Sequence, residues 1–286
     1  MEIPIIAAIV MSIASLVVFG IGEQNFILPE NNVISEINLV IPEPELELAK
    51  GVSVTISTSG DDSTSLDLSG GNGSTGPIDI IVVGVPTVSV ADALSNNATK
   101  ERGIHYHGYL APATITASLL DDYDVVLLQG DPYFDMNART AIGSFVENGG
   151  SLIVTEDTGS KHKEYKNVAG WSWPVGEGIP VPAMIVGEWE GISEIANASE
   201  IMIRDYNHPI AKGIKIKGID LGGNRVFKTV PQGSGEVIMI VNTTEGYVPA
   251  VIASGMNVGG AVAYFSYDPG ITPGILLNAV EWTRTP

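Results

Sequence analysis

The pattern of apolar and polar positions divides the chain into three parts. The first part, residues 1–29, contains an uncharged and almost wholly apolar run at positions 3–22. A run of about 20 apolar residues is long enough to cross a bilayer as a helix. Because this helix would be apolar on every face, it must be surrounded by lipid or by other protein. The pattern therefore predicts an N-terminal helix for membrane insertion or assembly.

The second part, residues 30–77, shows the alternation that is typical of short, half-buried strands. Apolar residues alternate with polar ones at Ile37, Leu39 and Ile41, and again at positions 52–56 and 66–68. Positions 69–77 are rich in Gly and Ser and predict a flexible linker. We expect a short β-rich stalk, although these strands could also form a small module or pair with a neighbouring subunit by strand addition.

From position 78 to 286 the pattern changes to alternating strands and helices. Continuous apolar runs are typical of strands buried on both faces, and Asp135 is a suitable N-cap for one of the helices. The predicted strands are 78–85, 124–129, 151–155, 237–241, 248–253 and 261–266, and the predicted helices are 89–102, 135–148 and 273–283. This order predicts an α/β domain of three layers with a mostly parallel sheet.

Charge and cysteine content narrow the range of functions. The chain has 33 acidic and 14 basic residues, a net charge of −19. This charge argues against nucleic acid and against an anionic membrane surface as partners, because both are bound through Lys and Arg. The sequence contains no cysteine, so disulfides, thiolate catalysis and cysteine metal ligands are excluded.

Four glycosylation sequons are spread along the chain, at Asn72, Asn97, Asn197 and Asn242. Such triplets fit an exported glycoprotein. They also arise by chance in any sequence rich in Ser, Thr and Asn, and the sequence leaves both interpretations open.

The apolar N-terminus lacks the basic flank of a cleaved secretory signal, since the first Lys or Arg is Lys50. In this pattern the first 28 residues resemble the mature N-terminus of type IV pilins and of archaeal pilus or archaellum subunits. Bacterial pilins usually carry Glu at the fifth mature position, whereas here the acid is Glu2 and position five is Ile5. That departure favours an archaeal assembly. The resemblance implies that a basic leader was removed before Met1 and that the helix enters the membrane before it packs with its copies as a filament core.

Residues 78–286 show a second resemblance, to the class I glutamine amidotransferase-like fold and especially to its ThuA-like relatives. The matching segments are 121–130, 145–155, 207–214, 259–269 and 276–282. The resemblance implies a flavodoxin-like domain in which catalytic members carry a Cys on a sharp turn after a strand. The matching turn here is 155–159, and it has no Cys. Thiolate hydrolysis of glutamine is therefore impossible, and we expect no catalytic residue and no cofactor in this domain.

Two histidines could still hold a metal. His105 and His107 lie two positions apart, so on a strand both rings would face the same side and, with a carboxylate, could ligate a metal ion. The alternative is a polar strand end at the carboxyl edge of the sheet. His208 belongs to a His-Pro-Ile turn and is expected to be structural, while His162 is expected to be solvated in a Lys-rich loop.

Four carboxylates could gather at the carboxyl ends of the strands, where open α/β sheets bind their ligands. They are Asp131, Glu156, Asp157 and Asp268. Such a group could bind Ca²⁺, although the alternative in so acidic a chain is an ordinary solvated surface.

Three tryptophans, Trp171, Trp173 and Trp189, lie in a Gly- and Pro-rich insertion. They could form a sugar platform or an interface anchor, or they could belong to the local core.

Together these patterns predict a structural subunit of an extracellular type IV pilus-like filament. Its partners would be copies of itself and, before assembly, the membrane. The globular domain would be displayed outside for adhesion to a surface or glycan target. The alternative is a membrane-anchored surface binding protein that does not polymerise. A carboxylate- or metal-dependent hydrolase is a further alternative.

Overall fold

The computed structural model describes residues 55–58, 64–67, 76–165, 170–172, 178–187, 193–215, 218–255 and 259–284. The chain separates into two compact units, Met1–Thr75 and Gly76–Arg284. In the first unit, β1 (Thr55–Thr58) and β2 (Thr64–Asp67) form an antiparallel pair. The predicted N-terminal helix, the strand at 37–41 and most of the linker lie outside the described residues. None of the described helices is both long enough and apolar enough to span a membrane.

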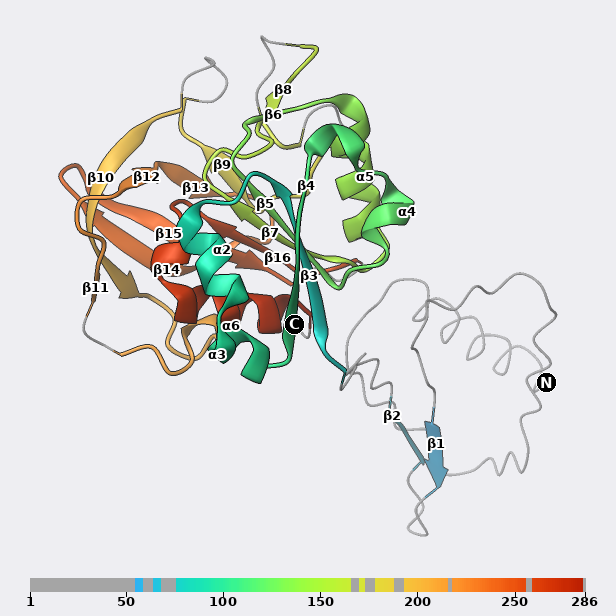
Figure 1. Ribbon diagram of the computed structural model, residues 1–286. Helices are drawn as coiled ribbons and strands as arrows, with labels where there is room; N and C mark the ends of the chain where they lie inside the picture. Colours follow the sequence, from blue (N-terminus) through green and yellow to red (C-terminus); the bar gives the residue numbers. More distant parts are fainter. Residues whose placement is uncertain are drawn as a thin grey trace, which may run out of the picture. The chain divides into compact units, whose positions relative to one another are not determined.

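The first half of the second unit alternates strands with helices, whereas most of its second half consists of successive strands (Figure 1). Its first half contains β3 (Ile78–Gly84), α2 (Val88–Ser95), α3 (Asn97–Glu101), β4 (Ile104–Leu110), η1 (Pro112–Thr114), α4 (Ala117–Leu120), β5 (Val125–Gln129), β6 (Tyr133–Phe134), α5 (Met136–Glu147), β7 (Ser151–Thr155) and β8 (Lys161–His162). Its second half contains β9 (Ala183–Ile185), β10 (Ile195–Ile203), η3 (Pro209–Ala211), β11 (Ile219–Asp220), β12 (Arg225–Phe227), β13 (Thr229–Pro231), β14 (Glu236–Thr243), β15 (Gly246–Ser254), β16 (Val262–Phe265), η4 (Pro269–Ile271) and α6 (Pro273–Arg284).

A ten-stranded sheet crosses this unit in the order β11-β10-β14-β15-β16-β7-β5-β3-β4, with β12 also paired to β10. The neighbours from β16 to β4 are parallel, whereas those from β11 to β16 are antiparallel. The prediction of a mixed α/β domain with a mainly parallel central sheet is confirmed. The antiparallel extension is an addition that the sequence pattern did not predict.

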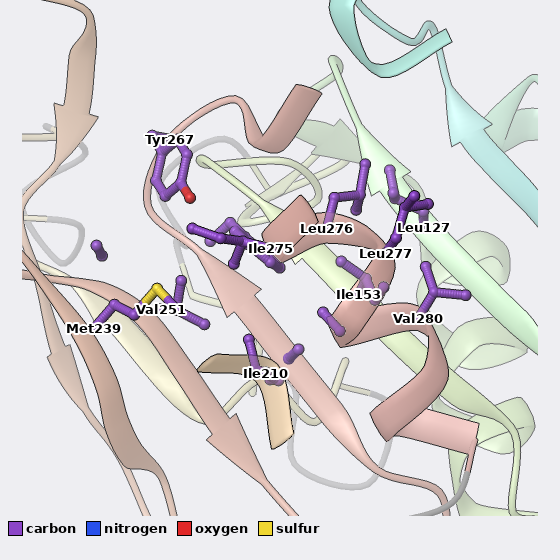
Figure 2. Close-up of a cluster of buried hydrophobic side chains, with 14 of the residues drawn as sticks. Leu127, Ile153, Ile210, Met239, Val251, Tyr267, Ile275, Leu276, Leu277 and Val280 are labelled. Carbon is purple, nitrogen blue, oxygen red and sulfur yellow. The ribbon is translucent and has the colours of Figure 1, made fainter. Parts of the chain in front are cut away.

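Helices cover both faces of the parallel strands, which explains why β5 and β7 are buried along their whole length. On one face, α2 and α6 pack on the larger hydrophobic core. Figure 2 shows Leu276, Leu277 and Val280 of α6 turned towards Leu127 of β5 and Ile153 of β7. On the other face, α4 and α5 cover a second core, which completes the predicted three layers (Figure 1).

The helix predicted at 89–102 is wrong in one respect, because it is broken into α2 and α3. Asn96 has an extended backbone, with φ −72° and ψ 166°, and its side chain accepts a hydrogen bond from the Thr99 N–H at 2.9 Å. Asn is a strong N-cap, so it begins a second helix instead of continuing the first. The predicted cap of α5 is confirmed, since the Asp135 carboxylate accepts the Ala138 N–H at 2.8 Å.

Candidate functional site

A sharp turn directly follows β7 at the carboxyl edge of the parallel strands. Among the described residues, Glu156 is the non-glycine residue with a positive φ, at 55°. This left-handed conformation costs roughly 1–2 kcal/mol for a residue with a Cβ. The turn is held in place by β16, because the Glu156 N–H donates to the Phe265 carbonyl at 2.8 Å. Strained residues of this kind concentrate at functional sites, so Glu156 marks the candidate site.

Three carboxylates interact at this turn. Burial raises the pKa of Glu156, and the charges of Asp268 and Asp157 raise it further, while Arg225 lowers it. Burial also raises the pKa of Asp157, opposed by Lys161, whose Nζ lies 3.8 Å from the Asp157 carboxylate. The structure therefore brings Glu156, Asp157 and Asp268 together, as the sequence predicted.

The fourth predicted carboxylate has a local role instead. Asp131 is exposed, and its side chain accepts the Tyr133 N–H at 2.8 Å in the loop after β5. It is not among the charges that shift the pKa of Glu156.

Hydrogen bonds connect Asp268 to the first turn of α2 and to the end of β5. The Ser89 hydroxyl donates to Asp268 at 2.6 Å, and the Gln129 amide donates to its other oxygen at 3.4 Å. Gln129 is fully buried, and its oxygen accepts the Thr87 N–H at 3.2 Å. Sequence reasoning missed this network. The available signal was the glutamine itself, a polar residue at the end of an otherwise apolar strand.

A buried arginine on α5 holds the loop after the turn through hydrogen bonds to its backbone carbonyls. The Arg139 guanidinium is 0 % exposed and donates to the carbonyls of Gly159, Gly170 and Trp171 at 2.5–2.7 Å. The Trp171 indole N–H in turn donates to the Thr158 carbonyl at 2.7 Å. Trp171 is therefore part of the local core, whereas Trp173 and Trp189 lie outside the described residues.

The two predicted metal-ligand candidates converge on one aspartate. His107 Nε2 lies 2.7 Å from Asp79 Oδ1, and His105 Nδ1 lies 3.8 Å from the same oxygen. Both imidazoles are about half exposed, and the described residues contain no group of three His, Asp or Glu side chains arranged to hold a metal ion. The pair lies at the amino end of β4, so the expected position at the carboxyl edge of the sheet is wrong.

Of the other two histidines, the expectation for His162 is wrong and the expectation for His208 is confirmed. His162 is buried, not solvated: it lies on β8, which pairs with β6, and its ring packs against that of Tyr165, with 4.7 Å between ring centroids. His208 has the expected structural role: its Nδ1 accepts the Ile210 N–H at 3.2 Å and its ring packs on Trp282. Burial lowers the pKa of His208.

The sequons differ in their exposure. Asn97 at the start of α3 and Asn197 on β10 are exposed, Asn242 on β14 is half-buried, and Asn72 lies outside the described residues.

Comparison with known proteins identifies the fold of the second unit and no more. No protein family and no curated protein sequence matches this chain. Among solved structures, a ThuA-like protein from Bacteroides uniformis is 15% identical with a TM-score of 0.50, over 73% of this chain and 92% of that one. This likeness supports the amidotransferase-like fold expected from the sequence.

Two β-galactosidases also share this fold. The enzyme of Rahnella sp. R3 has a TM-score of 0.50 and 13% identity over 77% of this chain. The enzyme of the haloarchaeon Halorubrum lacusprofundi has a TM-score of 0.50 and 14% identity over 72% of this chain. The matches cover 32% and 30% of those enzymes, so this chain spans about a third of their length.

Proposed function

We propose that this chain is a structural subunit of an extracellular type IV pilus-like filament. The N-terminal helices of many copies form the core, and the domain Gly76–Arg284 is displayed outside and serves in adhesion. The observation that carries the proposal is the uncharged apolar run at 3–22, upstream of a unit with its own hydrophobic cores. A helix that is apolar on all faces needs apolar neighbours on all sides, and a bundle of identical helices supplies them.

The turn after β7 supports a display role for the domain. The strained position of that turn is occupied by Glu156, and the chain has no cysteine that could act there as a thiolate nucleophile. The amidotransferase-like fold therefore lacks the thiol chemistry of its catalytic members. A fold can be kept as a stable scaffold after its activity is lost.

Negative-stain electron microscopy of the purified full-length protein tests the proposal. We expect long helical fibres from the unmodified chain and none from a Val10→Asp variant, because a charge in the helical core is costly to bury. A Ser12→Ala variant is the matched control and should still form fibres. Monomers that need detergent to stay dispersed, with no fibres in any condition, would contradict the proposal and favour the membrane-anchored binding protein.

One observation favours a second candidate function, a carboxylate-dependent hydrolase. A glutamate with a raised pKa on a strained turn is suited to act as a general acid. Chromogenic glycoside and ester substrates would test this candidate against the unmodified protein and a Glu156→Gln variant. Turnover that disappears in the variant would support the hydrolase; turnover that is absent, or equal in both proteins, would argue against it.

A further inference from the structure

A surface pocket lies where α2 ends, beside α3 and the first residues of β4 (Figure 1). Its volume is about 440 Å³, within the range of roughly 300–1,000 Å³ that is common for small-molecule sites. The pocket is at the amino end of β4, whereas Glu156 follows the carboxyl end of β7, so the parallel strands place the two at opposite ends of the sheet. The lining residues are Leu94, Ser95, Lys100, Ile104, His105 and Tyr106.

The apolar wall of this pocket is continuous with the larger hydrophobic core. Leu94 and Ile104 are buried members of that core, and Tyr106 packs against it while remaining half-buried. These side chains are held in place from within, so the wall is formed before any ligand arrives. An apolar ligand that covers it removes further apolar surface from water, which favours binding.

A positive charge stands beside this wall. Lys100 is exposed and has no carboxylate partner among the described residues. The neighbouring cation Arg102 is different, because its guanidinium is bound to the Glu281 carboxylate at 2.6 Å. In a chain with a net charge of −19, Lys100 is therefore a cation that an acidic ligand can still pair with.

The acidic side chain closest to this part of β4 faces away from the pocket. Ile78 and Ile80 of β3 belong to the same core as Leu94, and side chains alternate along a strand, so Asp79 lies on the other face of the sheet. His105 alternates in the same way with its neighbours on β4, and its Nδ1 lies 3.8 Å from Asp79 Oδ1 on that other face. The pocket side thus presents apolar groups and an ammonium group together.

We propose that this pocket binds a small monocarboxylate with an apolar body. The carboxylate would lie beside Lys100, and the apolar part would lie against Leu94 and Ile104. This chemistry follows from the combination of an apolar wall with a few polar groups, which is typical of small-molecule sites. The site belongs to the domain Gly76–Arg284 alone, so it does not depend on filament formation.

Saturation-transfer NMR with the full-length protein tests the proposal. The probe is phenylpropanoate, and the matched ligand is phenylpropanamide, which has the same apolar body without the charge. For so small a ligand we expect a Kd on the order of 1 mM. The amide should bind about fivefold more weakly, since an exposed ion pair contributes up to about that factor.

Two substitutions at Lys100 separate the charge from the apolar wall. Lys100→Met should weaken phenylpropanoate binding about fivefold, to the level of the amide, whereas Lys212→Met, at another exposed lysine, should leave it unchanged. Lys100→Glu should reverse the preference, so that phenylpropylamine binds more tightly than phenylpropanoate. Both variants change an exposed side chain of α3, so the fold should be retained.

Filling the pocket gives an independent test. Ser95 is exposed at the end of α2, and its hydroxyl donates to the Ala91 carbonyl of the same helix. Ser95→Trp should therefore block the pocket and abolish binding of both the carboxylate and the amide, with thermal denaturation confirming that the variant is folded. If this variant does not fold, the reversal in Lys100→Glu decides the question.

Three results would overturn the proposal. The first is no saturation transfer to phenylpropanoate at about 10 mM, well above the Kd expected for a ligand of this size. The second is equal affinity for phenylpropanoate and phenylpropanamide. The third is binding that is the same in Lys100→Met, in Lys212→Met and in folded Ser95→Trp, which would show adsorption elsewhere on the chain, for example on the apolar run at 3–22.

Discussion

The backbone N–H of Glu156 donates to the carbonyl of Phe265 at 2.8 Å, at the residue where φ turns positive. This hydrogen bond belongs to the last register pair of the parallel pairing between β7 and β16, Thr155↔Phe265. The turn that reverses the chain after β7 is thereby anchored to the neighbouring strand. The strain at Glu156 is maintained by the sheet and not by the loop alone.

Replacing Glu156 with glycine should stabilise the domain. Glycine adopts a positive φ at little cost, so Glu156→Gly should raise the free energy of unfolding by about 1 kcal/mol relative to Glu156→Gln. The comparison with Gln isolates the backbone effect, because both variants lose the carboxylate. Urea denaturation measures the difference, and a glycine variant no more stable than the glutamine variant would contradict the strain.

The raised pKa of Glu156 predicts a pH dependence of stability. Because the folded state holds the proton more tightly than the unfolded state, the ionised carboxylate disfavours folding at neutral pH. This disadvantage should disappear as the pH falls through the folded pKa towards the ordinary value for glutamate. Glu156→Gln should therefore be more stable than the unmodified protein at pH 7, with the gap closing near pH 4. A gap that is constant from pH 7 to pH 4 would show that the pKa is not raised.

The lowered pKa of His208 predicts a pH dependence of stability of the opposite sign. Burial lowers its pKa in the folded state, so the unfolded state binds the proton first as the pH falls below the ordinary value for histidine. Stability should fall on acidification through that range. A His208→Asn variant keeps a side chain that can accept the Ile210 N–H and has no titration. Denaturation curves at pH 7.5 and pH 5.5 should show a smaller loss in this variant; equal losses would contradict the prediction.

Removing the buried guanidinium should release the loop beyond the turn. Arg139→Ala removes the guanidinium hydrogen bonds to the carbonyls of Gly159, Gly170 and Trp171, of which the Trp171 carbonyl keeps the Ile179 N–H as a donor. We expect the free energy of unfolding to fall by about 3 kcal/mol. Arg139→Lys is the control: it keeps the charge but lacks the guanidinium fork, so it should be intermediate. Thermal denaturation measures the loss of stability, and limited proteolysis measures the release of the loop. An alanine variant as stable and as protease-resistant as the unmodified protein would contradict this role.

The sequence predicted those elements whose local signals and tertiary context agree. The buried strands β3, β5 and β7 read as nearly continuous apolar runs, and Asp135 identified the start of α5. The three interacting carboxylates followed from the rule that parallel strands end at one edge of a sheet.

Other features depend on contacts that a linear pattern does not contain. β10 was missed because its buried positions include the small residues Ala196 and Ala198, which give a weak apolar signal, and its pairing with β14 decides its structure. His162 was expected in solvent because its neighbours are lysines, whereas pairing with β6 buries it. Gln129 and Ser89 acquire their role from Asp268, which lies more than a hundred positions away in the sequence.

The most direct test of the account is a cryo-electron microscopy reconstruction of fibres assembled from the full-length protein. The account predicts a central bundle of packed α-helices formed by residues near the N-terminus. The domain Gly76–Arg284 should surround this bundle as separate outer density. Fibres whose axis is built from the sheet domain, or preparations that yield no fibres, would contradict it.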